Sequence, residues 1–227
     1  MKANIQNNRQ MKVPARKTQT SWWLPAGLVL LSIIPIIFGA LRLNQLISGA
    51  EITPDNARFF ASPSPVVIHI ISSAIYALLG AFQFASRLWT RGNKWHRWVG
   101  RFLVPLGLAV GLSGLWMTLF YDYPEGASRL LYGLRLFFGS GMVVSIIIGF
   151  ISIRQRNVSQ HQAWMTRAYA IGMGQATQVL TGLVGALTLG EVNEFENALL
   201  MGAGWVINLA VAEWIIRRRP TQQARTA

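Results

Sequence analysis

Six long apolar segments, separated by short polar connections, constrain this chain more than any other feature of its sequence. A membrane-spanning helix needs about 20 consecutive, mostly apolar residues. We expect six such helices, at 22–46, 65–86, 98–120, 130–153, 164–189 and 198–216. Only 13% of the residues are charged, whereas soluble domains carry about 25%. The sequence therefore predicts an all-α fold, a polytopic bundle of six transmembrane helices.

Lysine and arginine gather in every second connection between these segments. They occupy the N-terminal tail, the stretches 87–101 and 154–167, and the residues from 217 onward. The alternate loops carry the acidic residues Glu51, Asp55, Asp122, Glu125, Glu191, Glu194 and Glu196. Because short basic loops stay in the cytoplasm, we expect both termini there. The chain is therefore predicted to cross the membrane several times.

The domain organisation follows from the same pattern. We expect a disordered basic cytoplasmic tail at 1–20, the six-helix domain at 21–218 and a cytoplasmic C-terminal tail at 219–227. The net charge of +13 lies mostly between apolar runs, which does not give the solvated basic face that nucleic-acid binding needs. The expected partner is therefore the lipid bilayer and not nucleic acid, and protein partners stay open. The absence of cysteine excludes disulfides and thiolate metal sites.

Polar side chains inside the predicted spans are the candidates for a functional site, because such residues usually face the bundle interior. In the second span they follow one helical face, with His69, Ser73, Tyr76 and Gln83 among them. They fit either a cavity lining or hydrogen bonds that hold helices together. The candidate intramembrane site comprises Arg42, Tyr76, Gln83, Arg135, Gln178 and Asn208.

Three ionisable side chains share a similar depth near the predicted outer face, namely Arg42, His69 and Arg135. Since intramembrane charges tend to find partners, we expect these three to form one outer polar cluster. Glu213, near the inner end of the sixth span, can instead reach the interface by snorkelling.

The other two histidines open the third and fifth spans at the predicted cytoplasmic face. Each is followed by a tryptophan and by an arginine three residues after that tryptophan. This cytoplasmic-face motif comprises Arg97, Trp98, Arg101, Trp164 and Arg167. Trp and Arg are common at such an interface, but His96 and His161 are not required there. Because imidazole ligates haem iron, His69, His96 and His161 are candidate ligands of a b-type haem, whereas one metal site using all three is not expected at their different depths.

The chain resembles the predicted bacterial membrane proteins grouped as domain of unknown function 2306. The resemblance covers about 65–180 and rests on His69, on Gly80, Gln83 and Phe84, on Arg91, on His96, Arg97, Trp98, Gly100 and Arg101, and on His161, Trp164, Met165, Arg167 and Tyr169. Members often carry an arginine shortly before the second tryptophan, where Gln162 and Ala163 stand here. The resemblance implies a helical membrane protein and no established activity. Its bacterial members, together with the basic loops expected in the cytoplasm, predict a multi-pass protein of the bacterial inner membrane.

The sequence holds no catalytic motif, and we predict no catalytic residue. Three functions stay open. The first is a non-catalytic membrane protein of unknown molecular role, such as an assembly or interaction factor. The second is a b-type haem-binding redox carrier, and the third is a transporter of small solutes or lipids that uses the polar stripe and Arg135.

Overall fold

A computed structural model describes residues 22–84, 94–122 and 128–218 of the chain. The regular structure of these residues is entirely helical, as predicted. The helices are α1 (Trp23–Ser48), α2 (Ala57–Ala61), α3 (Pro63–Gln83), α4 (Lys94–Phe120), α5 (Arg129–Arg154), α6 (Val158–Gly172), α7 (Gly174–Leu189) and α8 (Glu194–Arg217). The predicted tails at 1–20 and 219–227 lie outside the described residues.

The helices agree with the prediction of a bundle that crosses the membrane several times. Helices α1, α3, α4, α5 and α8 are each long and apolar enough to cross a bilayer, and α6 with α7, bent by 44°, gives a sixth span if the pair is counted as one. The outside of the bundle is apolar, and Phe137 and Leu187 are 71% and 77% exposed. Such a surface needs lipid around it, so the multi-spanning fold is confirmed.

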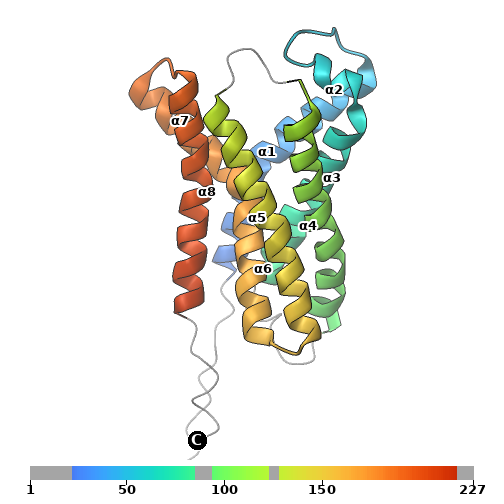
Figure 1. Ribbon diagram of the computed structural model, residues 1–227, viewed down its shortest axis with the longest axis vertical. Helices are drawn as coiled ribbons and strands as arrows, with labels where there is room; N and C mark the ends of the chain where they lie inside the picture. Colours follow the sequence, from blue (N-terminus) through green and yellow to red (C-terminus); the bar gives the residue numbers. More distant parts are fainter. Residues whose placement is uncertain (1–21, 85–93, 123–127, 219–227) are drawn as a thin grey trace, which may run out of the picture.

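The two ends of the bundle differ in charge. In Figure 1, α1 begins and α8 ends toward the lower end, where the turn from α5 to α6 also lies. We call this the basic end, since it carries Arg97, Arg101, Arg154, Arg156, Arg217 and Arg218. The opposite end, called the α2 end, carries Glu51, Asp55, Asp122, Glu191, Glu194 and Glu196. That the basic end faces the cytoplasm stays a prediction.

Side-chain caps fix where several helices begin. Asn157 accepts a hydrogen bond from the main-chain N–H of Gln160 at the start of α6. Asn193 and Glu196 form a reciprocal capping box at the start of α8. Both arrangements satisfy N–H groups that have no partner within the helix, so the turns on either side of the bent span are well defined.

The core of the bundle is packed around two tyrosines in the half nearer the basic end. The rings of Tyr76 and Tyr169 have centroids 5.7 Å apart, and the Tyr169 hydroxyl donates to the main-chain oxygen of Ala77 over 2.8 Å. Gly80 and Gly107 lie directly against these rings. A glycine at each place lets the helices approach closely around these two rings.

The fifth span was predicted as one helix over 164–189, and the structure divides it into α6 and α7. Met173 separates the two helices, and the main-chain oxygen of Ala170 accepts a hydrogen bond from the Asn208 side chain over 3.2 Å. The Asn208 side-chain oxygen in turn accepts from the Thr177 hydroxyl over 2.8 Å. Helix α8 therefore stabilises the break through a side chain that touches both halves.

Candidate functional site

A cavity of about 690 Å³ occupies the half of the bundle nearer the α2 end. Residues from all six spans and from α2 line it, and we call it the polar cavity. Its polar lining comprises Ser32, Arg42, Arg58, His69, Ser73, Thr118, Tyr121, Asp122, Arg135, Gln175 and Gln178. Its apolar lining includes Ile36, Phe38, Val66, Met142, Val179 and Trp205. Cavities of this size hold small-molecule ligands, and this one offers both charged and apolar surfaces.

Two arginines meet at one aromatic ring where the cavity reaches the α2 end. The guanidinium carbons of Arg42 and Arg58 lie 4.6 Å and 4.8 Å from the centre of the Phe59 ring. Arg42 also donates to the side-chain oxygen of Gln45 over 2.8 Å. Within the described part of the chain, neither guanidinium has a carboxylate within 4.0 Å. Both guanidiniums therefore contact the neutral Phe59 ring, and Arg42 also contacts the neutral amide of Gln45.

Tyr121 fixes the aromatic wall beside these arginines. Its ring stands edge-on to Phe59 at 5.5 Å, and its hydroxyl donates to the main-chain oxygen of Ser62 over 2.7 Å. Tyr121 follows the last residue of α4, and burial raises the pKa of its phenol. Tyr121 therefore remains neutral at physiological pH and does not cancel the charge of the two guanidiniums.

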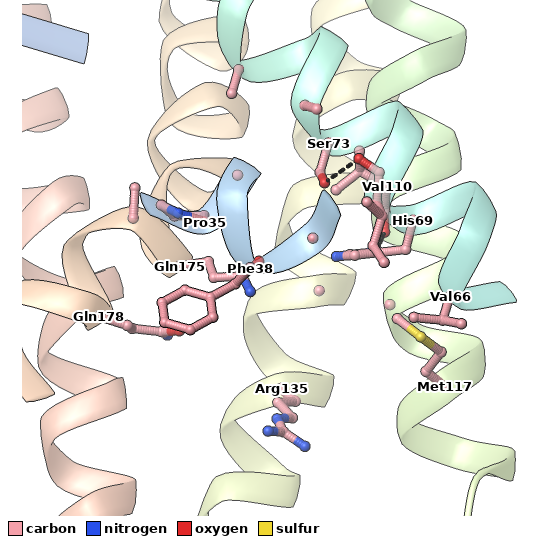
Figure 2. A pocket seen from close by; sticks show the side chains of 18 of the residues that line it. Pro35, Phe38, Val66, His69, Ser73, Val110, Met117, Arg135, Gln175 and Gln178 are labelled. Atoms are coloured by element: carbon pink, nitrogen blue, oxygen red, sulfur yellow. Dashed lines mark hydrogen bonds between the residues drawn. The ribbon is translucent and has the colours of Figure 1, made fainter. Parts of the chain in front are cut away.

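His69 lies deeper in the cavity and has one ring nitrogen already engaged. Its Nδ1 is 3.1 Å from the main-chain oxygen of Val110 and 3.0 Å from the Ser113 hydroxyl oxygen. A carbonyl oxygen only accepts hydrogen bonds, so Nδ1 carries the hydrogen that it donates. In the neutral ring the lone pair is then on Nε2, at the far tip. Figure 2 shows the side chain reaching from α3 toward the interior of the cavity.

The break in the fifth span brings two glutamines to the other side of the cavity. Figure 2 shows Gln175 and Gln178 across the opening from His69, with Arg135 on α5 seen between them. Gln178 donates to the main-chain oxygen of Met201 over 2.9 Å, which ties α7 to α8. Gln175 is the second residue of α7 and comes directly after the bend. The angle of the bend therefore sets the direction of its side chain.

The structure divides the predicted intramembrane residues into two groups. Arg42, Arg135 and Gln178 line the polar cavity together with His69. Tyr76 instead belongs to the packed core, Gln83 is the last residue of α3, and Asn208 supports the break. Arg42, His69 and Arg135 thus line one cavity, and the outer polar cluster expected of them stays a prediction.

Sequence reasoning missed Arg58, Gln175 and Tyr121 as lining residues. Arg58 stands in a connection that we took for a mainly acidic loop, and α2 turns it toward the bundle. Gln175 was visible as a polar residue in the least apolar span, but its direction depends on a bend that has no strong signal in the sequence. Two glycines flank Met173, and this is the one local sign of the break.

The other two histidines come together at the basic end. His96 and His161 lie close enough for a charge on one imidazole to act on the other, and His161 Nδ1 is 2.8 Å from the main-chain oxygen of Gly149. His69 lies in the opposite half, so the three histidines do not share one site. Among the described residues, no group of three or more His, Cys, Asp or Glu side chains is placed to hold a metal ion.

Each repeated tryptophan of the basic end contacts the arginine three residues later. The guanidinium carbons of Arg101 and Arg167 lie 5.3 Å and 4.6 Å from the rings of Trp98 and Trp164. Arg167 also forms a two-pronged ion pair with Glu213, with N–O distances of 2.5 Å and 3.2 Å. We expected Glu213 to reach the membrane interface by snorkelling. It instead pairs with Arg167 and so links α8 to α6. Arg97 lies exposed on α4.

The fold defines a polytopic α-helical membrane protein with a charged cavity between its helices. The family model described as "Predicted membrane protein (DUF2306)" matches residues 66–216, well over half of the chain. The chain belongs to this family, which confirms the resemblance predicted from the sequence and extends it into α8. No curated protein matches the chain. No solved structure matches it either.

Proposed function

We propose that this protein binds an amphipathic anion in the polar cavity and acts in the membrane as a receptor or carrier for it. The observation that carries this proposal is the pair of guanidiniums at Phe59. Arg42 and Arg58 point their charges at one neutral ring, at the mouth of a cavity whose lining also includes apolar side chains such as Phe38, Val179 and Trp205. A ligand with an anionic head and an apolar body matches both parts.

The energetics of intramembrane charge favour this assignment. A charged side chain near a bilayer costs several kcal/mol unless it pairs or reaches water, and such residues commonly mark ligand or ion pathways. The guanidinium group also presents a planar set of donors that binds a carboxylate or a phosphate through two parallel hydrogen bonds. Arg135, on the adjoining wall, adds a third positive charge to the same cavity, and Asp122 contributes one carboxylate, so the arginines outnumber the acidic side chains of the lining.

The direction of access follows from the charge distribution along the bundle. If short basic connections stay in the cytoplasm, the polar cavity opens toward the opposite face of a bacterial inner membrane. An amphipathic anion then enters from the outer leaflet or from the solution beside it. The carboxylate or phosphate group is common to both sources, whereas only a membrane lipid stays in the bilayer throughout.

The broken span supports a carrier. In many transporters a discontinuous helix lies at the binding site, and its two halves contribute to the contact with substrate. Here the break at Met173 adjoins the cavity, and both Gly172 and Gln175 line it. The binding function requires no catalytic group, in keeping with the lack of a catalytic motif.

A comparison of matched ligands tests the proposal. The purified protein in nanodiscs of a zwitterionic lipid is titrated with dodecyl phosphate, a neutral dodecyl glycoside and dodecyl trimethylammonium, and binding is followed by tryptophan fluorescence. We expect the phosphate to bind at least tenfold more tightly than the other two. An anionic phospholipid added to the nanodisc competes with it if the natural source is a lipid. Equal affinity for the three head groups contradicts the proposal.

A further inference from the structure

The imidazole of His69 has a feature that binding of an anionic head group does not use. Its Nδ1 donates to the Val110 main-chain oxygen, which leaves the lone pair of the neutral ring on Nε2. Histidines that bind metals are held in this way, because a hydrogen bond from one nitrogen to a main-chain oxygen fixes the tautomer and raises the basicity of the other. His69 is one of the residues that line the cavity.

The ring is also held in position from α4. A methyl group added at Gly114 would lie 3.4 Å from Cε1 of His69, so the α4 backbone runs beside the imidazole. The Ser113 hydroxyl donates to the main-chain oxygen of Ala109 and presents its own oxygen to Nδ1 at 3.0 Å. The direction of the Nε2 lone pair is therefore set by two contacts on Nδ1 and by one close backbone.

The positive charges stand on one side of this nitrogen. Gly39 packs against Ile70, the neighbour of His69, so Arg42 lies roughly one turn, about 5 Å at 1.5 Å per residue, nearer the α2 end. Arg58 belongs to α2 itself. The cavity thus places a nitrogen lone pair in its deeper part, apolar walls around it and guanidiniums toward its mouth.

We propose that the amphipathic anion is an iron porphyrin of the haem class, with Nε2 of His69 as an axial ligand and Arg42 and Arg58 binding its two carboxylates. This inference rests on the proposed function and names the ligand class. The macrocycle supplies the apolar body and its carboxylates supply the anionic head. A single histidine suffices as the protein ligand of a haem iron, so the site does not need His96 or His161, which lie in the other half of the bundle.

A comparison of the binding of a porphyrin that contains iron with that of the same porphyrin without iron distinguishes haem ligation from simple anion binding. Hemin and metal-free protoporphyrin IX share the same carboxylates and apolar ring, and only hemin can be ligated by His69. The full-length protein in nanodiscs is titrated with each, and absorption spectra are recorded. We expect a sharpened, shifted Soret band for hemin and an affinity at least tenfold higher than that of protoporphyrin IX.

Variants assign the effect to His69. In His69→Ala the hemin affinity is expected to fall to that of protoporphyrin IX, and free imidazole is expected to restore the wild-type spectrum by occupying the vacated space. His69→Gln keeps a donor for Val110 and tests the same loss with less disturbance of the helix contact. His96→Gln and His161→Gln are matched controls that leave the spectrum unchanged.

The outcomes distinguish failure of this inference from failure of the proposed function. An unchanged hemin spectrum in both His69 variants, or equal affinity of wild-type protein for the two porphyrins, overturns the haem assignment. If dodecyl phosphate binds while hemin does not, the haem assignment is also overturned and anion binding stands. If neither porphyrin nor dodecyl phosphate binds, both proposals are overturned.

Discussion

The side-chain amide of Asn208 donates a hydrogen bond to the main-chain oxygen of Ala170, 3.2 Å away. In a continuous helix that oxygen would accept from the N–H of the residue four positions later, Gly174. The fifth span is interrupted between these residues, and α8 supplies a substitute donor. An unsatisfied main-chain group in a membrane costs several kcal/mol, so this contact lets the span bend and direct Gln175 toward the polar cavity.

Replacement of Asn208 with alanine is expected to destabilise the protein by about 1–2 kcal/mol, since it removes an interhelical hydrogen bond and leaves the Ala170 oxygen without its donor. The measurement is the thermal unfolding midpoint in detergent. Asn197→Ala is the matched control, because Asn197 is exposed on the same helix. A midpoint for Asn208→Ala equal to that of the control would show that α8 does not hold the break.

Gly174→Ala tests the same break from the other side. An added Cβ would collide with the indole ring of Trp205, and we expect a loss of roughly 1–3 kcal/mol from overpacking. Gly133→Ala in α5 is the control, because nothing lies within 4 Å of its added Cβ and alanine favours the helix by about 0.5–1 kcal/mol. Unfolding midpoints that move in the same direction for both variants would contradict the close packing of α7 on α8.

Hydropathy and charge predicted a bundle of membrane-crossing helices with one basic and one acidic end, because both are properties of many residues at once. The bend at Met173 was not predicted, because the contacts that support it come from Asn208, distant in the sequence. Arg42, His69 and Arg135 line one cavity, and their action as one polar cluster stays a prediction. The inclusion of Arg58 in that lining could not be predicted, because it depends on how the short helix α2 folds back over the bundle.

The ion pair between Arg167 and Glu213 is expected to couple α6 to α8. Breaking an ion pair in low-dielectric surroundings leaves an uncompensated charge, but the two side chains are 25% and 33% exposed, so we expect a loss of only about 1–3 kcal/mol for Glu213→Gln. In a double-mutant cycle, Arg167→Gln together with Glu213→Gln should lose less than the sum of the two single losses. Glu194→Gln, exposed at the other end of α8, is the control, and additive losses would exclude coupling.

The predicted orientation in the membrane can be tested by labelling single introduced cysteines, because the chain itself contains no cysteine. Asp55→Cys places a thiol at the α2 end and Ser159→Cys places one at the basic end, and both positions are exposed. A membrane-impermeant maleimide added to intact cells is expected to label the first, and to label the second only after the cells are permeabilised. The reverse pattern would mean that the polar cavity opens to the cytoplasm.

The role of the cavity arginines is tested most directly by the affinity of the protein for dodecyl phosphate when charges are removed one site at a time. Arg42→Gln and Arg58→Gln each remove a guanidinium at Phe59, whereas Arg129→Gln removes one from the same end of the bundle that does not line the cavity. A hydrogen bond to a charged group contributes about 1.5–3 kcal/mol, which corresponds to roughly tenfold or more in affinity. We predict at least tenfold weaker binding for each cavity variant and a dissociation constant within twofold of wild type for Arg129→Gln. Equal dissociation constants for all three variants would contradict anion binding in the polar cavity.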